Sequence, residues 1–163
     1  MRNEITQTRL HELFDYKNGQ LLWKVSTKHS KVKIGDVAGN DNGRYIRVRI
    51  DKKTYTLHRL IFCYHHGYCP EIVDHIDNNK SNNNICNLRE ATKTQNMFNS
   101  KLPITSTTKV KNVVYVKAND NYRVMLRING KKKSFGCYSD LELADLVASE
   151  ARDKFHGRFA RHG

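Results

Sequence analysis

A carboxylate and an imidazole stand side by side in the stretch VDHID, at Asp74 and His75. The stretch has the composition of a strand end. Side chains alternate across a strand, but at a frayed end both can reach one cavity. Asn96, expected on a following helix, adds an amide oxygen. Carboxylate and amide oxygens suit Mg²⁺, which keeps several waters and needs few protein ligands beside a substrate phosphate.

The imidazole of His75 adds proton transfer to this set. Its ordinary pKa of about 6.5 makes it available at neutral pH to take a proton from an attacking water. A metal held by Asp74 and Asn96 would stabilise the charge that develops on the phosphate and on the leaving oxygen. These side chains therefore predict hydrolysis of a phosphodiester with Mg²⁺ (or Mn²⁺) as cofactor.

Asparagine is concentrated between Val73 and Ser100. Most of these residues suit loop positions that need left-handed backbone or local side-chain hydrogen bonds. Asn87, before the apolar Leu88, is better placed to brace the loop against the metal site. The sequence thus predicts that Asn96 is a metal ligand, that Asn87 braces the loop and that the other asparagines mainly form turns. The asparagines are Asn78, Asn79, Asn82, Asn83, Asn84, Asn87, Asn96 and Asn99.

The charge of the chain is large and uneven. Its 163 residues carry a net charge of +13. Residues 1–70 have 13 basic and 6 acidic side chains, as do residues 101–163, so each flank has a net charge of +7. Residues 71–100 have 3 basic and 4 acidic side chains, a net charge of −1. This pattern indicates a polyanionic partner, nucleic acid before membrane, that is bound by the flanks.

The segment before the Asp-His pair predicts short elements. Thr6 or Thr8 could cap a helix that places Leu10, Leu13 and Phe14 on one face. Asn18-Gly19 indicates a hairpin turn before the strand QLLWKV. The apolar run RLIFCYHHG predicts a buried helix that ends at Gly67.

The stretch RYIRVRI, residues 44–50, alternates polar and apolar side chains, which is typical of a half-buried strand. Its open face would carry Arg47 and Arg49. That face is either solvated or a surface for phosphates and bases, and the net charge favours the second interpretation.

Residues 109–163 predict a three-stranded antiparallel sheet with one helix. The strands are NVVYVK, YRVMLRI and KKKSFGCY, with an Asn129-Gly130 turn between the last two. Ser139 and Glu142 predict a capping box for the helix, and Gly157 its end. Its apolar stripe comprises Ala144, Val147, Ala148, Ala151 and Phe155. The opposite sheet face would present Arg123, Arg127 and Lys132 and has the chemistry to enter a DNA major groove.

The bulk composition predicts a protein of the cell interior. The start MRNEITQTRLHELF lacks the apolar core of a signal peptide, and no run reaches the ~20 apolar residues of a membrane span. The four cysteines form no C-x-x-C pair and are expected to be reduced thiols. We expect a cytoplasmic monomer without membrane contact, in the host cytoplasm if a phage encodes it.

The stretch from Leu57 to Ser100 resembles the HNH (His-Me finger) endonuclease module of phage and intron homing endonucleases. The matching residues are His58-Arg59, Asp74-His75-Ile76-Asp77, the loop from Asn83 through Asn87-Leu88-Arg89, and Asn96. The resemblance implies an α+β fold with a ββα-metal core behind an N-terminal antiparallel sheet. It also implies cleavage of double-stranded DNA, as a nick or a double-strand break.

The same resemblance implies the role of each site residue. His75 would be the general base, Asp74 and Asn96 the metal ligands, and Asn87 the residue that orients the site. Arg59 and Arg89 are further candidates for DNA contacts. The nuclease domain would span residues 1–100, with a β-rich part at 1–57 and the HNH motif at 58–100.

Residues 109–163 resemble an AP2-type DNA-binding domain. The residues on which this resemblance rests include Val113-Val114-Tyr115, Phe135-Gly136 and Gly157. Asn112 replaces the usual glycine before the first strand, and the strands lack the tryptophan common in that family. Residues 101–108, KLPITSTT, are predicted to be a linker with few contacts across it.

Two other interpretations compete with a nuclease. One is a non-catalytic DNA-binding regulator on an HNH-like scaffold, which predicts a broken catalytic set. The other is a zinc-stapled nucleic-acid binder, although the cysteine spacing is unusual for zinc. Its candidate ligands are Cys63, His65, His66, Cys69 and Cys86.

Overall fold

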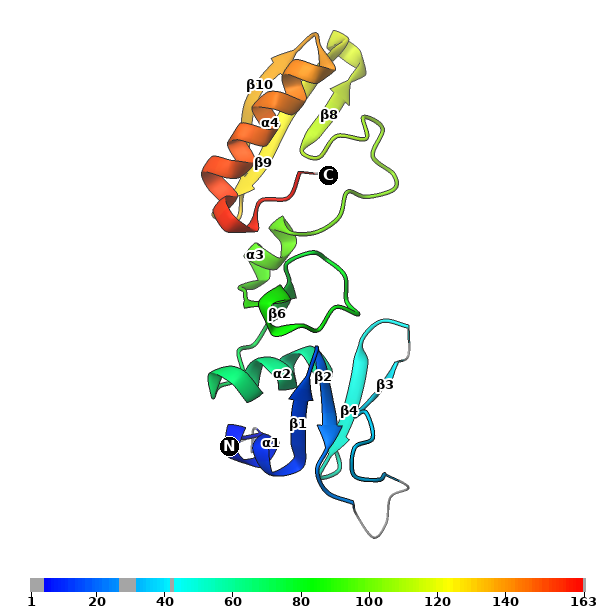
Figure 1. Ribbon diagram of the computed structural model, residues 1–163. Helices are drawn as coiled ribbons and strands as arrows, with labels where there is room; N and C mark the ends of the chain where they lie inside the picture. Colours follow the sequence, from blue (N-terminus) through cyan, green and yellow to red (C-terminus); the bar gives the residue numbers. More distant parts are fainter. Residues whose placement is uncertain (1–4, 27–31, 42, 163) are drawn as a thin grey trace. The chain divides into compact units, whose positions relative to one another are not determined.

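The computed structural model describes residues 5–26, 32–41 and 43–162. The first four residues of the stretch MRNEITQTRLHELF therefore lie outside the described residues. The chain forms two compact units, Met1–Thr92 and Lys93–Gly163 (Figure 1). Both are mixed α+β. No helix among the described ranges has both the length and the apolar character to cross a membrane.

The first unit opens with a helix and a hairpin. Thr6 caps α1 (Gln7–Leu13) by accepting a hydrogen bond from the Arg9 amide. Strands β1 (Phe14–Lys17) and β2 (Gln20–Trp23) pair across Asn18-Gly19, where both residues have positive φ, so the predicted turn is confirmed. Phe14 was expected on the helix but begins β1, and it still lies fully in the core.

A second small sheet carries the predicted arginine face. Strands β3 (Asn40–Asp41), β4 (Ile46–Ile50) and β5 (Lys53–Thr56) are antiparallel in the order β3-β4-β5. Val48 and Ile50 are buried while Arg47 and Arg49 are exposed, which confirms the period-2 pattern.

Helix α2 (Leu57–His66) is the centre of the first unit. It packs against β2, β4, β5 and the strands that follow it. Its buried residues are Leu57, His58, Leu60, Ile61, Phe62 and Cys63. The helix ends at Gly67 in left-handed backbone, as predicted. The chain then forms β6 (Val73–His75) and β7 (Leu88–Glu90), with the short helix η1 (Ile85–Asn87) between them.

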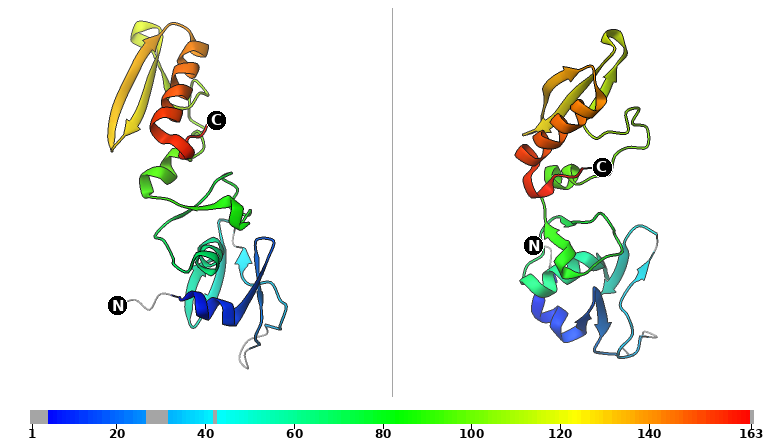
Figure 2. Two further views of the ribbon diagram at one scale, coloured as in Figure 1. Left: turned by 60° about the vertical axis from the view of Figure 1, so that its left-hand side comes forward. Right: turned by 45° about the horizontal axis from the view of Figure 1, so that its top comes forward.

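The second unit begins with helix α3 (Lys93–Phe98) and continues as a three-stranded sheet. Strands β8 (Val113–Val116), β9 (Asn121–Ile128) and β10 (Lys131–Tyr138) follow one another with β9 central, and η2 (Lys117–Asn119) joins the first two. Helix α4 (Leu141–His156) lies across one face of this sheet and η3 (Gly157–Phe159) follows it (Figures 1 and 2).

The register of this sheet is the predicted one. Arg127 pairs with Lys132 and Ile128 with Lys131 across the Asn129-Gly130 turn. Val124 and Leu126 are buried under α4, and they pack with Ala144, Ala148 and Ala151. Arg123, Arg127 and Lys132 therefore share the opposite face of the sheet.

Two details at the ends of α4 differ from the sequence prediction. The N-cap is Asp140, whose carboxylate accepts the Leu143 amide, so the capping box assigned to Ser139 is wrong by one residue. At the other end, Arg152 and His156 are buried, although only apolar residues were expected there. They lie four residues apart and therefore on one side of the helix.

The predicted mixed α+β class is confirmed. The ββα-metal and AP2-like arrangements, and the domain limits 1–100 and 109–163, stay predictions. The division between the compact units falls after Thr92, so α3 belongs to the second unit. Residues 101–108 also lie within that unit.

Candidate active site

The Asp-His pair lies on a two-stranded ladder of three residues per strand. In β6 and β7, Asp74 is opposite Arg89 and His75 is opposite Leu88. Asp74 and His75 are buried, with 6% and 5% of their surface exposed. Successive strand residues point to opposite faces. The two side chains accordingly meet different neighbours.

Asp74 forms a buried ion pair with Arg89. The guanidinium donates from Nε at 2.9 Å and from Nη2 at 2.8 Å, both to Oδ2 of the carboxylate. Bonds between charged groups at this distance are strong and directional. Arg89 therefore orients Asp74, whereas the sequence predicts Arg89 as a DNA contact.

The ring of His75 is held by Asn83. The His75 Nε2 and Asn83 Oδ1 atoms are 3.0 Å apart, and Asn83 is only 3% exposed. Because an amide oxygen can only accept, this bond places the imidazole proton on Nε2 and leaves Nδ1 as the basic nitrogen. From its type and surroundings in the sequence, Asn83 is predicted to be a turn former. Only its position in the HNH-like loop indicates a role at the site.

Two further rings surround His75. The His58 ring centroid lies 4.9 Å from that of His75, and Tyr45 stacks 6.4 Å away at an interplanar angle of 22°. Burial, with smaller contributions from His75 and Arg59, lowers the pKa of His58 to about 3. His58 is therefore neutral at pH 7 and places no positive charge beside His75.

Asn87 connects parts of the loop between β6 and β7 through its side-chain hydrogen bonds, and its predicted role at a metal site stays a prediction. Its Nδ2 donates to Asp77 Oδ1 at 2.9 Å and to the Asn82 carbonyl at 2.8 Å. Its Oδ1 accepts the Asp77 amide. Burial acts to raise the pKa of Asp77, but hydrogen bonds from Asn82, the Asn79 amide and Asn87 outweigh it, and the pKa lies below its ordinary value. The ionised Asp77 is thus the centre of the loop.

The loop also carries a cation to the edge of the site. Lys80 Nζ lies 5.0 Å from the centroid of the Tyr45 ring. Tyr45 immediately precedes β4, whose exposed face presents Arg47 and Arg49. The three cations and the tyrosine form a surface suited to a phosphate backbone, and we call it the β4 basic surface.

The other predicted DNA-contact residues have different surroundings. Arg59 is half-buried and donates to the Pro70 carbonyl at 3.1 Å, so part of its guanidinium stabilises the fold. Arg123, Arg127 and Lys132 lie in the second unit, on the sheet face away from α4. Their role as DNA contacts stays a prediction.

The predicted metal ligands fit an oxygen-coordinated cation by their chemistry. Asp74 offers a carboxylate fixed by Arg89, and Asn96 is an exposed residue of α3 in the second unit. One carboxylate with one amide is a donor set for Mg²⁺ or Mn²⁺ rather than for a softer metal. Within residues 5–26, 32–41 and 43–162, no cluster of three or more His, Cys, Asp or Glu side chains is placed to hold a metal ion.

The cysteines proposed for zinc have other contacts in the described part of the chain. Cys63 Sγ lies 3.8 Å from the Ile5 carbonyl, and Cys69 Sγ lies 3.9 Å from the Arg59 carbonyl. His65 packs edge-on against Tyr16, and His66 packs on Phe62.

The sequence matches a family model and is similar to viral proteins. A family model described as HNH endonuclease matches residues 55–98, the span from β5 through α3. Protein 3.8 of Escherichia phage T7 is 33% identical over 89 residues, which cover 55% of this chain and 73% of the phage protein. The Uncharacterized HNH endonuclease L245 of Acanthamoeba polyphaga mimivirus is 30% identical over 151 residues.

The chain therefore contains an HNH endonuclease domain, which the family model places at residues 55–98. The match to the mimivirus protein covers 88% of this chain and 42% of the mimivirus protein, so this chain spans less than half of that relative. No solved structure matches the chain.

Proposed function

We propose that the protein is a metal-dependent endonuclease of the homing type that hydrolyses phosphodiester bonds in double-stranded DNA. The observation that carries this proposal is the buried His75, whose Nε2 is fixed by Asn83 and which follows an Asp74 oriented by Arg89. A general base needs a defined tautomer and a defined direction, and this arrangement supplies both.

In this mechanism His75 Nδ1 takes the proton from the attacking water. Asn83 keeps Nε2 protonated, and neutral His58 leaves the imidazole without a close like charge on that side. Asp74 and, as the sequence predicts, Asn96 would hold Mg²⁺ or Mn²⁺. When bound, such an ion supplies positive charge to the phosphate and to the leaving oxygen. Asn87 keeps the loop closed around these groups.

DNA binding is assigned to two basic surfaces, one on each unit. The β4 basic surface would contact the backbone beside the Asp-His pair. The sheet face with Arg123, Arg127 and Lys132 would read DNA in the manner of an AP2-like domain, and a separate reading unit is what a homing-type nuclease needs for a long target. Action as a monomer in the host cytoplasm is part of the same proposal.

Plasmid cleavage tests the proposal directly. Supercoiled plasmid is incubated with the full chain in Mg²⁺ or in EDTA, and nicked, linear and intact DNA are resolved. We expect nicked or linear product in Mg²⁺ alone, and none from His75→Ala at equal DNA binding. If the protein is instead a non-catalytic DNA-binding regulator, the wild type and His75→Ala should both bind the plasmid and neither should cut it.

A further inference from the structure

Helix α3 has little stability of its own. It has six residues, none of them buried. An isolated helix of this length does not persist in water. Yet it carries Asn96, the proposed second metal ligand, whose amide oxygen must be held in place to coordinate an ion. The contacts that fix α3 therefore matter for the site.

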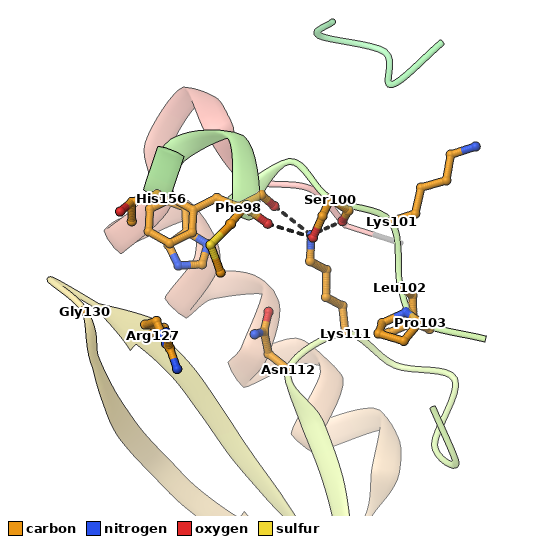
Figure 3. A pocket seen from close by; sticks show the side chains of 12 residues that line it. Phe98, Ser100, Lys101, Leu102, Pro103, Lys111, Asn112, Arg127, Gly130 and His156 are labelled. Carbon is orange, nitrogen blue, oxygen red and sulfur yellow. Dashed lines mark hydrogen bonds between the residues drawn. The ribbon is translucent and has the colours of Figure 1, made fainter. Parts of the chain in front are cut away.

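Lys111 caps the carboxyl end of α3. Its Nζ donates to the Phe98 and Ser100 carbonyls, each at 2.7 Å (Figure 3). The last carbonyls of a helix lack partners within the helix and carry partial negative charge, so a lysine is a suitable cap. Burial, then Arg152 and Arg161, lower the pKa of Lys111 to about 8, which still leaves it charged at pH 7.

His156 holds the same end of α3 from the other side. Its ring stacks on Phe98 with centroids 3.6 Å apart and planes within 9° (Figure 3). Phe98, Lys111 and His156 line one pocket of about 310 Å³. His156 is 8% exposed, so the stack is shielded from water.

Helix α4 supports both contacts. Arg152 Nη1 donates to the Lys111 carbonyl at 2.6 Å, and Arg152 is itself 2% exposed. Arg152 and His156 are the two polar residues that interrupt the apolar stripe of α4. They lie one turn apart and fix the lysine cap and the aromatic stack, respectively. Neither residue is part of the apolar cluster through which α4 packs on the sheet.

We propose that Lys111 and His156 are positioning residues of the nuclease. By clamping the end of α3 they fix Asn96 for metal coordination, so residues beyond the HNH motif control its metal affinity. The inference rests on the proposed function for the role of Asn96.

Hydrogen exchange and metal binding test it on the full chain. Lys111→Met removes the cap, and His156→Leu removes the ring. Lys109→Met is the matched control, because exposed Lys109 also donates to a backbone carbonyl, that of Ile104, at 3.0 Å. Exchange of residues 93–100 should accelerate roughly tenfold or more in Lys111→Met, as expected for losing a charged hydrogen bond. It should also accelerate in His156→Leu, which loses the aromatic stack on Phe98. It should not change in the control.

Mn²⁺ affinity, measured by titration without DNA, should fall about 10–100-fold in Lys111→Met and His156→Leu, as when outer partners of a ligand are removed. Asn96→Ala shows how much Mn²⁺ affinity is lost when the proposed ligand itself is removed. Lys111→Arg and His156→Phe keep the donor and the ring, and both should restore binding. If Lys111→Met does not fold, the His156→Phe and His156→Leu pair decides the question.

The possible outcomes separate the two proposals. Unchanged exchange, or faster exchange with unchanged Mn²⁺ affinity, would overturn the positioning role. DNA cleavage by the wild type with equal Mn²⁺ affinity in all variants would overturn it as well and would leave the proposed function standing. A wild type that binds Mn²⁺ as described yet cuts no DNA would refute the nuclease and keep the positioning role.

Discussion

At the scale of single residues, one hydrogen bond sets the chemistry of His75. The Asn83 amide oxygen fixes the tautomer, and the loop that carries Asn83 is itself braced by Asn87 and Asp77. The concentration of asparagine in this loop therefore has two causes. Several of these side chains cap turns, whereas Asn83 and Asn87 hold the site.

Asn83→Ala tests this division. Losing the Nε2 partner frees the imidazole to rotate and to change tautomer, so the cleavage rate should fall by about 10–100-fold, a typical cost for removing a partner of a functional group. DNA affinity should stay the same. Asn84→Ala is the control, since the Asn84 side chain is exposed and accepts a hydrogen bond from the nearby Cys86 amide. Equal rates for the two variants would remove Asn83 from the mechanism.

His58 makes the first unit sensitive to acid. Its pKa is about 3 in the folded chain against about 6.5 when unfolded, so the unfolded chain binds more protons between these values. The contribution of neutral His58 to the free energy of unfolding is therefore fully present above pH 6.5. It is lost as the pH falls toward 3. The full effect is on the order of 5 kcal/mol.

Urea unfolding at pH 7 and pH 4.5 measures this effect. Trp23 is the one tryptophan of the chain and packs on the core of the first unit, so its fluorescence reports that unit. His58→Phe keeps a ring at this position and should lose less stability on acidification than the wild type does. A wild type with equal stability at both pH values would contradict the prediction.

At the scale of elements, hydrophobic periodicity predicted the strands and helices well. The alternation in β4, the register across Asn129-Gly130 and the end of α2 at Gly67 follow from local rules of burial and turn geometry. The rest depends on contacts between distant residues. The burial of Arg152 is explained by the Lys111 carbonyl 41 residues away, which no local pattern encodes.

The candidate site divides in the same way. The residue types and adjacency of Asp74 and His75 were visible in the sequence. Arg89, Asn83 and Tyr45 contact Asp74 or His75 only because the chain folds back on itself. Partners that are brought in by strand pairing or loop closure have no fixed spacing from the residues they serve.

The cap of α4 gives a prediction at this scale. Asp140→Ala should destabilise the second unit by about 1 kcal/mol, because the Leu143 amide loses its acceptor. Ser139→Ala should have little effect. Thermal unfolding, followed by circular dichroism, distinguishes the two. A larger loss for Ser139→Ala would restore the capping box that the sequence suggested.

At the scale of the whole molecule, the HNH match and the compact units overlap without coinciding. The family match ends at residue 98, whereas the second unit begins at Lys93. A short helix thus belongs to the motif by sequence and to the second unit by its contacts. The segment 101–108, predicted to be a linker, lies between α3 and its lysine cap.

Truncation after Thr105 removes Lys111, Arg152 and His156 together. From sequence alone, residues 1–105 would be expected to keep cutting DNA. With α3 unclamped, we instead expect a markedly higher Mg²⁺ requirement. DNA affinity should also fall, with the dependence of log K on log salt flattened by ~0.9 for each phosphate that the fragment no longer neutralises. Wild-type cleavage at wild-type Mg²⁺ by this fragment would contradict the expectation.

The lysine cap has one more consequence. Ile104 is 94% exposed within the segment between α3 and Lys111, so the chain could be cut there without disturbing the cap or the aromatic stack. The two fragments would carry the halves of one interface and should reassemble when mixed. The result would be a split nuclease. We expect each fragment alone to be inactive at a low metal concentration, and the mixture of the two fragments to be active.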